Sequence, residues 1–346
     1  MSRTTLPRKI LRKIIHLAAP HVPLGLYRRL TSRNPVGFMY HAVSDGDLPH
    51  IRHLYPYKST AAFEQDIRYL KEHYTLVGYP ELLAHVNDEA ALPPDAAFVS
   101  FDDGFVECYG VVHPILQKHG IPCIFFLVTD FIDNQRLYYR GKMSLCIDKI
   151  SQLDAPTQRE TLEEFTKTFN LPPADPQTFA VWLLPHQQTD EPLVDRVCET
   201  LGVDVSEFLR TRQPFLTREQ IREMRSEGFV FGAHTRRHPK LAFLSQEEQA
   251  AEIIESCRVV AEITGDEQTP FAFPFSGGGV GREFLADLRA RHPRVGLVFD
   301  TKKLRRDERF IFHRIWVDKT VPGVPPERNI EHWLHDAYVR NLRGMW

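Results

Sequence analysis

The sequence of 346 residues lacks most of the features that mark secreted, membrane-spanning or nucleic-acid-binding proteins. It has no run of about 18 apolar residues, so no membrane-spanning helix is expected. Lys and Arg number 43 against 45 Asp and Glu, and this balance argues against a protein dedicated to nucleic acid. The five cysteines are scattered and odd in number, which favours reduced, buried thiols in a cytoplasmic protein over a disulfide framework.

The first 33 residues are basic, and they also lack the clean apolar core and cleavage site of a signal peptide. Within residues 6–30, basic and apolar residues alternate at helical spacing. Such a helix fits the surface of an anionic membrane, and it equally fits a helix that packs on the protein with a solvated basic face. The first alternative would hold a cytoplasmic protein peripherally at the inner membrane.

The clearest candidate site lies where the apolar run at residues 97–101 ends at two adjacent carboxylates, Asp102 and Asp103. The run is rich in aromatic and β-branched residues and therefore predicts a buried strand. In α/β proteins, chemistry collects where such strands end. Adjacent carboxylates repel each other, and a metal ion would offset this while leaving one as ligand and the other as base. A turn or a helix N-cap is the alternative.

A second apolar run, at residues 229–233, ends before two histidines, His234 and His238. Their spacing of four residues places both imidazoles on one side of a turn, within reach of one ion. Pro239 disfavours helical dihedrals at His238, so the pair is expected on a loop at a strand end. The two segments together therefore predict a metal site.

These segments also resemble a known family. Phe101-Asp102-Asp103-Gly104, followed downstream by His234-Thr235-x-x-His238, is similar to the motifs of the polysaccharide deacetylases, whose catalytic region is the NodB homology domain (carbohydrate esterase family 4-like). Residues 39–43 resemble the first strand of one branch, and residues 271–275 resemble an aromatic-Pro-aromatic segment that lines the family's site. The resemblance covers residues 36–132 and 215–318.

The alternation of predicted strands and helices indicates parallel βα units. The resemblance sharpens this to an α/β fold, a distorted, incomplete (β/α) barrel of the NodB type with a helical insertion. Two capping boxes, which begin at Thr217 and Ser245, predict the starts of two helices. The expected units are a basic amphipathic N-terminal arm at 1–33, the barrel at 34–132 and 214–320, a helical insertion or lid at 133–213, and a C-terminal helical tail at 321–346.

The resemblance implies a ligand set of one carboxylate and two imidazoles, from Asp103, His234 and His238. Such a set leaves open positions on a divalent ion, as a catalytic site requires. Zn²⁺ is the first expectation, and Co²⁺, Mn²⁺, Fe²⁺ and Ni²⁺ are also compatible with these ligands.

The resemblance implies further that Asp102 is the catalytic base and that the backbone N–H of Phe275 holds the oxyanion. Tyr40 and Pro274 are expected to contact the substrate. The family often has an arginine just before the aromatic-Pro-aromatic segment, where it braces the base. This chain has Ala272 at that position.

The general acid of the family is a histidine near the last strand, and His313 is the candidate here. A structural histidine inside an apolar strand is the alternative. His41, which follows the first predicted strand, is a second candidate acid, a substrate-binding residue or a packed strand-end histidine. Arg314 is expected either to brace Asp102 or to bind a phosphate of the substrate.

The expected function is that of a metal-dependent hydrolase that removes an N-acyl group, above all N-acetyl, from an amino sugar. The substrate would be lipid- or nucleotide-linked and would belong to exopolysaccharide or lipopolysaccharide biosynthesis. One alternative is a deformylase of a lipid-linked amino sugar, and another is a deacetylase of an exported polymer. A third is a catalytically silent glycan-binding module, against which the four intact site residues argue.

Overall fold

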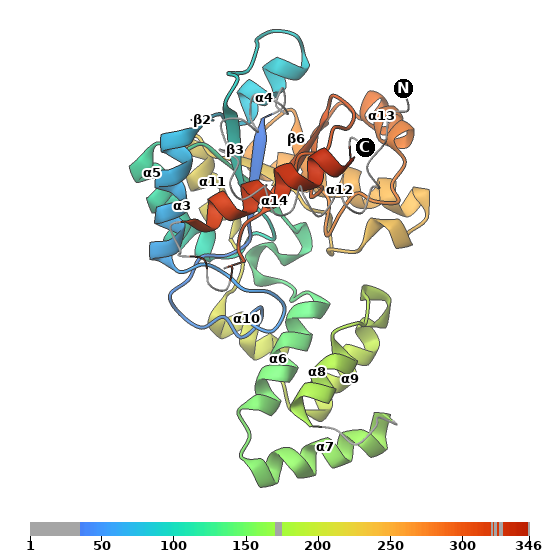
Figure 1. Cartoon of the computed structure of the whole chain (residues 1–346). Coiled ribbons are helices and arrows are strands. Elements are labelled where there is room, and N and C mark those ends of the chain that lie inside the picture. The colour runs from blue at the N-terminus through green and yellow to red at the C-terminus, as the bar shows by residue number, and fades with distance from the viewer. Residues whose placement is uncertain (1–34, 170–174, 320, 322–323, 325–327, 345–346) are drawn as a thin grey trace, which may run out of the picture.

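The computed structural model describes residues 35–169, 175–319, 321, 324 and 328–344 (Figure 1). The predicted arm at 1–33, with its amphipathic stretch at 6–30, lies outside this range. Within the described residues, no helix combines the length and the apolar character needed to cross a membrane.

Seven parallel strands form a closed barrel in the order β1-β8-β7-β6-β5-β4-β3, and the ring closes because β3 also pairs with β1. The short β2 pairs with the outer side of this ring through β3. The predicted (β/α) barrel of the NodB type is therefore confirmed. The strands are β1 (Val36–Tyr40), β2 (Thr75–Leu76), β3 (Ala96–Phe101), β4 (Cys123–Leu127), β5 (Val230–Ala233), β6 (Thr269–Ala272), β7 (Val295–Asp300) and β8 (Ile311–Trp316).

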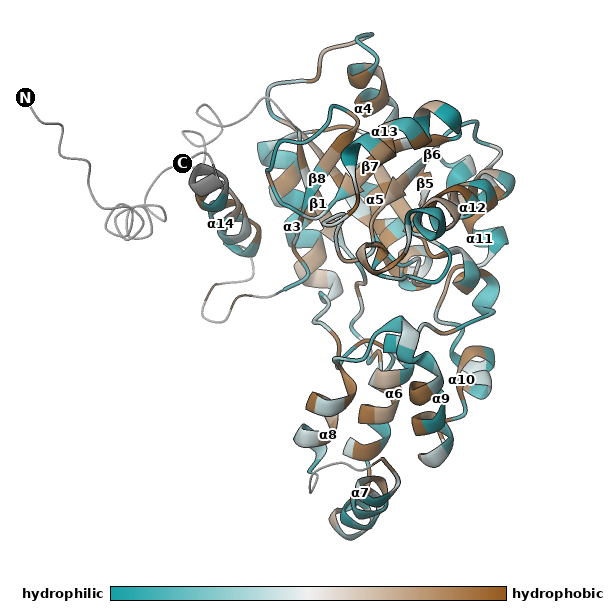
Figure 2. Cartoon of the chain, turned by 90° about the vertical axis from the view of Figure 1, so that its right-hand side faces the viewer, coloured by the Kyte–Doolittle hydropathy of each residue, from teal (hydrophilic) through white to brown (hydrophobic). Residues whose placement is uncertain are grey.

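The barrel strands are apolar along nearly their whole length, because side chains on both faces are buried (Figure 2). Phe299 fills part of this interior and packs against the rings of Phe98 and Phe126, with centroids 5.5 Å and 5.1 Å away. Because all strands run parallel, their carboxyl ends meet at one rim of the barrel, which is called the rim below.

Helices cover the outside of the barrel, and local sequence signals set their ends. The capping boxes at Thr217 and Ser245 are both present, and Gly265 ends the second helix in the left-handed conformation with φ 76°. C-terminal α14 packs against α3 and β8. The covering helices are α3 (Thr60–His73), α4 (Tyr79–Val86), α5 (His113–His119), α11 (Arg218–Ser226), α12 (Gln246–Thr264), α13 (Arg282–Arg291) and α14 (Asn329–Gly344), with short segments η2 (Cys108–Val112), η3 (Thr129–Asn134) and η5 (Leu241–Phe243).

Between β4 and β5 the chain forms a helical insertion that projects from the rim side of the barrel (Figure 1). It has its own apolar core, in which Met143, Phe165 and Phe179 are fully buried. A separate apolar cluster joins its base to the barrel through Tyr138 and Phe131. The insertion consists of α6 (Tyr139–Ser151), α7 (Ala155–Phe169), α8 (Pro176–Leu183), η4 (Gln188–Asp190), α9 (Glu191–Thr200) and α10 (Val205–Arg212).

Candidate active site

Two strand ends bring the predicted ligands together. Asp103 follows β3 and His234 follows β5, and only β4 separates these strands in the sheet. The Nε2 atoms of His238 and His234 lie 3.3 Å and 3.6 Å from Oδ1 of Asp103. All three side chains are buried, and one ligand atom from each lies within 4.8 Å of the others. The structure thus assembles the predicted trio at the rim.

The trio fits a divalent cation, because its donor atoms converge without partners of their own. Oδ1 of Asp103 is buried and accepts no hydrogen bond from the described residues. Nδ1 of His234 lies 2.9 Å from the carbonyl oxygen of Ala272, which can only accept, so this nitrogen carries the proton. The lone pair of His234 on Nε2 therefore faces Asp103, as in a metal-binding histidine held by a backbone carbonyl.

Protonation states in this cluster suit metal binding. Burial lowers the pKa of His234 to about 4, so the imidazole is neutral at pH 7. Burial alone would raise the pKa of Asp103, but nearby His238, together with His41 and His234, outweighs it and holds this pKa well below its usual range. A neutral imidazole and an ionised carboxylate are the forms that coordinate metals.

The backbone around the cluster is strained. Nine non-glycine residues have positive φ within the described part of the chain, and four of them form this site: Asp103 (72°), Thr235 (64°), His238 (62°) and Phe275 (59°). Such conformations cost on the order of 1–3 kcal/mol each and persist where the surroundings fix them. Here the Thr235 hydroxyl accepts a hydrogen bond from the His238 N–H at 3.0 Å, which closes the turn between the histidines.

Asp102 is held apart from the trio by an arginine fork. Nη1 and Nη2 of Arg314 donate to its two carboxylate oxygens at 2.6 Å and 2.9 Å, and Nη1 also donates to Ser100 Oγ at 3.1 Å. Both charged side chains are buried, with Arg314 0% and Asp102 2% exposed. Gly37 makes room for this arginine inside the barrel, since a Cβ there would lie 2.9 Å from Cγ of Arg314. Arg314 was expected either to brace Asp102 or to bind a phosphate of the substrate, and its observed contact is with Asp102.

His41 also belongs to the rim. Its Nδ1 lies 2.6 Å from Oδ2 of Asp318, and the indole N–H of Trp316 donates to the same oxygen at 2.7 Å. The imidazole packs against Tyr55 at 4.8 Å between centroids, and the Tyr55 hydroxyl donates to Asp103 at 3.0 Å. Burial works against protonation of His41, but the hydrogen bond and charge of Asp318 dominate and raise its pKa to about 9.

Sequence reasoning missed Asp318, Trp316 and Tyr55. Asp318 follows the last strand much as Asp102 follows β3, and this shared pattern is the signal that would have found it. Tyr55 lies in the loop between β1 and α3, and nothing in the sequence points from that loop to Asp103.

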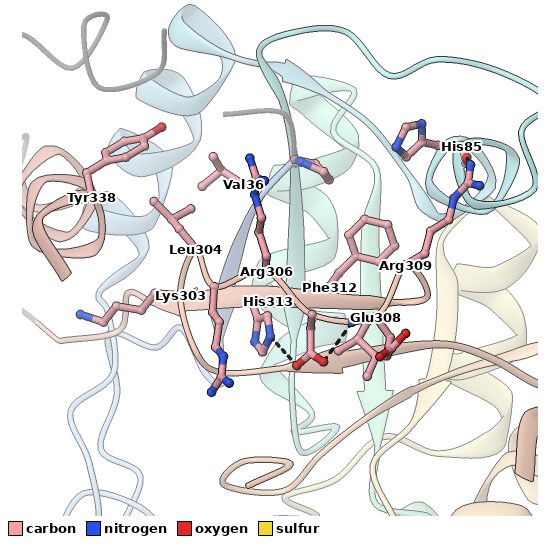
Figure 3. Close-up of a pocket in the computed structure, with 14 residues that line it drawn as sticks. Val36, His85, Lys303, Leu304, Arg306, Glu308, Arg309, Phe312, His313 and Tyr338 are labelled. Carbon is pink, nitrogen blue, oxygen red and sulfur yellow. Dashed lines mark hydrogen bonds and ion pairs between the residues drawn. The ribbon is translucent and has the colours of Figure 1, made fainter. Parts of the chain in front are cut away.

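The structure does not bring His313 to this cluster. Neighbouring residues of a strand point to opposite faces, and Arg314 occupies the inner face, so His313 faces outward. Its Nε2 lies 3.1 Å from Oδ2 of Asp307, and Figure 3 shows His313 among the residues that line the pocket there. Its Nδ1 accepts from the Lys302 N–H at 3.2 Å. It lines a separate cavity of about 110 Å³ that also contains Val36, the first residue of β1.

The two other predicted substrate contacts differ in position. Tyr40 is 0% exposed, and its hydroxyl donates to Asp66 at 3.1 Å under α3, so the structure does not bring it to the pocket. Pro274 is buried in the turn that presents Phe275. Phe275 is 38% exposed, and its ring centroid lies 4.9 Å from that of the predicted ligand His238. An exposed aromatic ring beside the cluster offers a stacking surface for a sugar.

Comparisons with known proteins concern the family and the fold of this chain. The family model described as "Polysaccharide deacetylase" matches residues 89–290, more than half of the 346 residues. No curated protein matches the chain in sequence.

Among solved structures, the following three share the fold. The structure of IcaB from Ammonifex degensii is 17% identical with a TM-score of 0.54, over 88% of this chain and 98% of that one. Streptococcus pyogenes deacetylase PplD in complex with acetate is 16% identical with a TM-score of 0.53, over 88% and 99%. A de-N-acetylase from Aggregatibacter actinomycetemcomitans is 16% identical with a TM-score of 0.53, over 86% and 98%. At these identities the likeness concerns the fold.

Proposed function

The chain belongs to the polysaccharide deacetylase family, and from this premise we propose that it removes the N-acetyl group of an amino sugar by metal-dependent hydrolysis. One observation carries the metal-dependent part of the proposal. Three buried donor atoms, from Asp103, His234 and His238, converge within 4.8 Å, and a second carboxylate stands beside them without joining them. The Asp102 Oδ2 atom lies 4.0 Å from Nε2 of His234, which is close to the proposed ion site but too far for a hydrogen bond to His234. Asp102 would therefore remain available to accept a proton.

Asp103, His234 and His238 would hold the ion, with Zn²⁺ as the first candidate for one carboxylate and two imidazoles. When bound, a divalent ion lowers the pKa of a coordinated water and polarises an amide carbonyl. Tyr55 supports the ligand set, because its hydroxyl donates to the Asp103 oxygen that does not face the histidines.

Asp102 would accept the proton of the attacking water. The Arg314 fork fixes the orientation of this carboxylate and offsets its buried charge, while each oxygen keeps a second lone pair. As water adds to the carbonyl carbon, its proton passes to Asp102, and the N–H of Phe275 would donate to the developing oxyanion. The support for this role is that the ring of Phe275 lies beside His238, with 4.9 Å between the ring centroids.

His41, rather than His313, would donate the proton to the sugar nitrogen as the C–N bond breaks. The Asp318 carboxylate keeps the pKa of His41 at about 9, so the imidazole is protonated at neutral pH and has a proton to give. Its contact with Tyr55 connects it to the ligand Asp103 at the rim. His313, by contrast, is bound to Asp307 on the outer face of β8.

The substrate would be an N-acylated amino sugar linked to a lipid or a nucleotide, in the assembly of a surface polysaccharide. The support is the basic, amphipathic stretch at residues 6–30, which would hold a cytoplasmic enzyme at the inner membrane. Flotation with anionic liposomes tests this part. The full-length protein should float and a form of residues 34–346 should not, and identical behaviour of both forms would exclude membrane contact through the arm.

The hydrolase itself is tested by the acid that it releases. Metal-loaded protein is incubated with a panel of sugar nucleotides and lipid-linked amino sugars, and acetate and formate are quantified separately. Acetate release that depends on Asp102 supports the proposal. Formate alone would instead identify a deformylase, and tight glycan binding without either acid would identify a binding module.

A further inference from the structure

The charges at the rim are unevenly paired. Its buried carboxylates all have cationic or imidazole partners: Asp102 contacts Arg314, Asp103 contacts the ligand histidines and Asp318 contacts His41. Four cations near the rim have no carboxylate within ion-pair distance in the part of the chain that the structure describes, namely Arg140, Lys240, Lys302 and Lys319. The charge left uncompensated around the site is therefore positive.

Arg140 is the one of these cations that contacts the ring of Phe275, which lies beside His238. It lies in the first turn of α6, where the helical insertion begins, and it is half-buried. Its guanidinium carbon lies 5.7 Å from the ring centre of Phe275, and that ring in turn contacts the ligand His238. Tyr138, two residues earlier, places its ring centroid 5.9 Å from that of His238. The insertion thus reaches the site through its first residues.

Two of the other cations follow strands that end at the rim. Lys302 follows β7, and its Nζ lies 3.7 Å from the position that a Cβ on Gly278 would occupy, in the loop after Phe275. Lys319 follows Asp318, and its Nζ lies 4.4 Å from the ring centre of Trp316. A divalent ion on one carboxylate and two neutral imidazoles would add further positive charge at the rim.

A half-buried guanidinium without a carboxylate partner loses part of its hydration free energy. The cation–π contact with the ring of Phe275 compensates for only a part of this loss. Arginine presents a planar fork of donors that matches the paired oxygens of a phosphoryl or carboxylate group. We propose that Arg140 binds an anionic group of the substrate, next to the N-acylated sugar that lies against Phe275. This inference rests on the proposed function and narrows its substrate class to acidic or phosphorylated amino sugars.

The test compares three probes that all contain N-acetylglucosamine: neutral tetra-N-acetylchitotetraose, a hyaluronan tetrasaccharide with carboxylates, and N-acetylglucosamine 1-phosphate. Calorimetry on the metal-loaded, full-length protein gives Kd, and acetate release gives kcat and KM. The wild type should bind at least one anionic probe roughly ten-fold or more tightly than the neutral one, because a charge-assisted hydrogen bond contributes that much. The probe that shows the preference identifies carboxylate or phosphoryl as its source.

Arg140→Gln should reduce this preference about ten-fold, through KM rather than kcat, and Arg140→Lys should reduce it less. The matched control is Arg210→Gln, which removes an exposed arginine of the same insertion that pairs with Glu207, and it should leave the preference unchanged. In the wild type alone, the preference should also shrink as ionic strength rises, which needs no variant to fold.

Equal affinity of the wild type for all three probes would overturn the inference, and so would an Arg140→Gln variant that weakens neutral and anionic probes alike. Calorimetry reports binding without turnover, so the two proposals fail separately. Arg140-dependent anion binding without acetate release would reject the hydrolase and leave the anion site standing. Acetate release from all three probes at equal efficiency, in the wild type and in Arg140→Gln alike, would reject the anion site and leave the hydrolase standing.

Discussion

Arg314 holds both carboxylate oxygens of Asp102, a residue 212 positions earlier in the chain, through bonds of 2.6 Å and 2.9 Å. The two residues belong to β8 and to the end of β3, which both pair with β1. The arginine therefore spans β1, beside Gly37, to reach Asp102. An orienting contact of this kind exists only once the barrel is closed.

Arg314→Met should destabilise the protein strongly, because it leaves the buried charge of Asp102 without a partner. Removing one member of a buried pair costs on the order of 3–5 kcal/mol. Urea denaturation would show the loss as a lower midpoint. The double variant Arg314→Met/Asp102→Asn, in which no charge remains, should recover part of the stability, and a double variant as unstable as the single one would contradict this view of the pair.

Asp102→Asn should separate metal binding from turnover. The amide keeps the size of the side chain but cannot accept a proton, so we expect a rate loss of about 10²–10⁴-fold. Metal content, measured by inductively coupled plasma mass spectrometry, should stay at the wild-type level, because the ligands are Asp103 and the two histidines. If the variant lost the ion as well as activity, Asp102 would itself be a metal ligand.

The alkaline limb of the pH–rate profile should depend on Asp318. The folded pKa of His41 is about 9, above the ordinary 6.5, so the protonated acid is present below this value and the rate falls as pH rises through it. Asp318→Asn removes the raising interaction, burial then dominates, and the limb should move to lower pH. By linkage, the stability that this contact contributes is complete below pH 6.5 and is lost as pH rises through 9.

Thermal melts as a function of pH give a second reading of the same contact. The difference in stability between wild type and Asp318→Asn should be largest below pH 6.5 and should close above pH 9. An alkaline limb that stays in place in the variant would show that His41 is not the acid.

Removal of the metal should abolish activity and lower the melting temperature. A ligand that binds only the folded state stabilises it by about 2.7 kcal/mol when its free concentration is 100 times Kd. Dialysis against a chelator, followed by re-addition of Zn²⁺ or Co²⁺, measures both effects. His238→Ala should melt at the same temperature with and without added metal, while His332→Ala, on α14, should respond as the wild type does.

Much of the site could be predicted because its signals are local. An apolar strand that ends in paired carboxylates, and another that ends before spaced histidines, place these groups at the same rim once the strands run parallel. The capping boxes at Thr217 and Ser245 define helix starts by the same short-range logic. None of these inferences required knowledge of which strands are neighbours.

The parts of the site that could not be predicted depend on which face of a strand points into the barrel. β8 is buried on both faces, so its sequence does not distinguish the outward His313 from the inward Arg314. Tyr40 has the same ambiguity at the end of β1, and its hydroxyl turns to Asp66 under α3. The contact of Asp318 with His41 joins residues 277 positions apart, and only the closed ring brings them together.

The position of β8 in the chain has a consequence for how the protein becomes active during translation. The three proposed metal ligands all lie before residue 239, whereas Arg314 lies in β8, the strand that completes the ring, and Asp318 follows that strand. A nascent or prematurely terminated chain that stops before residue 311 therefore contains every proposed ligand, yet it lacks the residue that orients Asp102 and the carboxylate that pairs with His41. The proposed activity would thus depend on the last strand of the barrel, although that strand supplies no ligand to the ion.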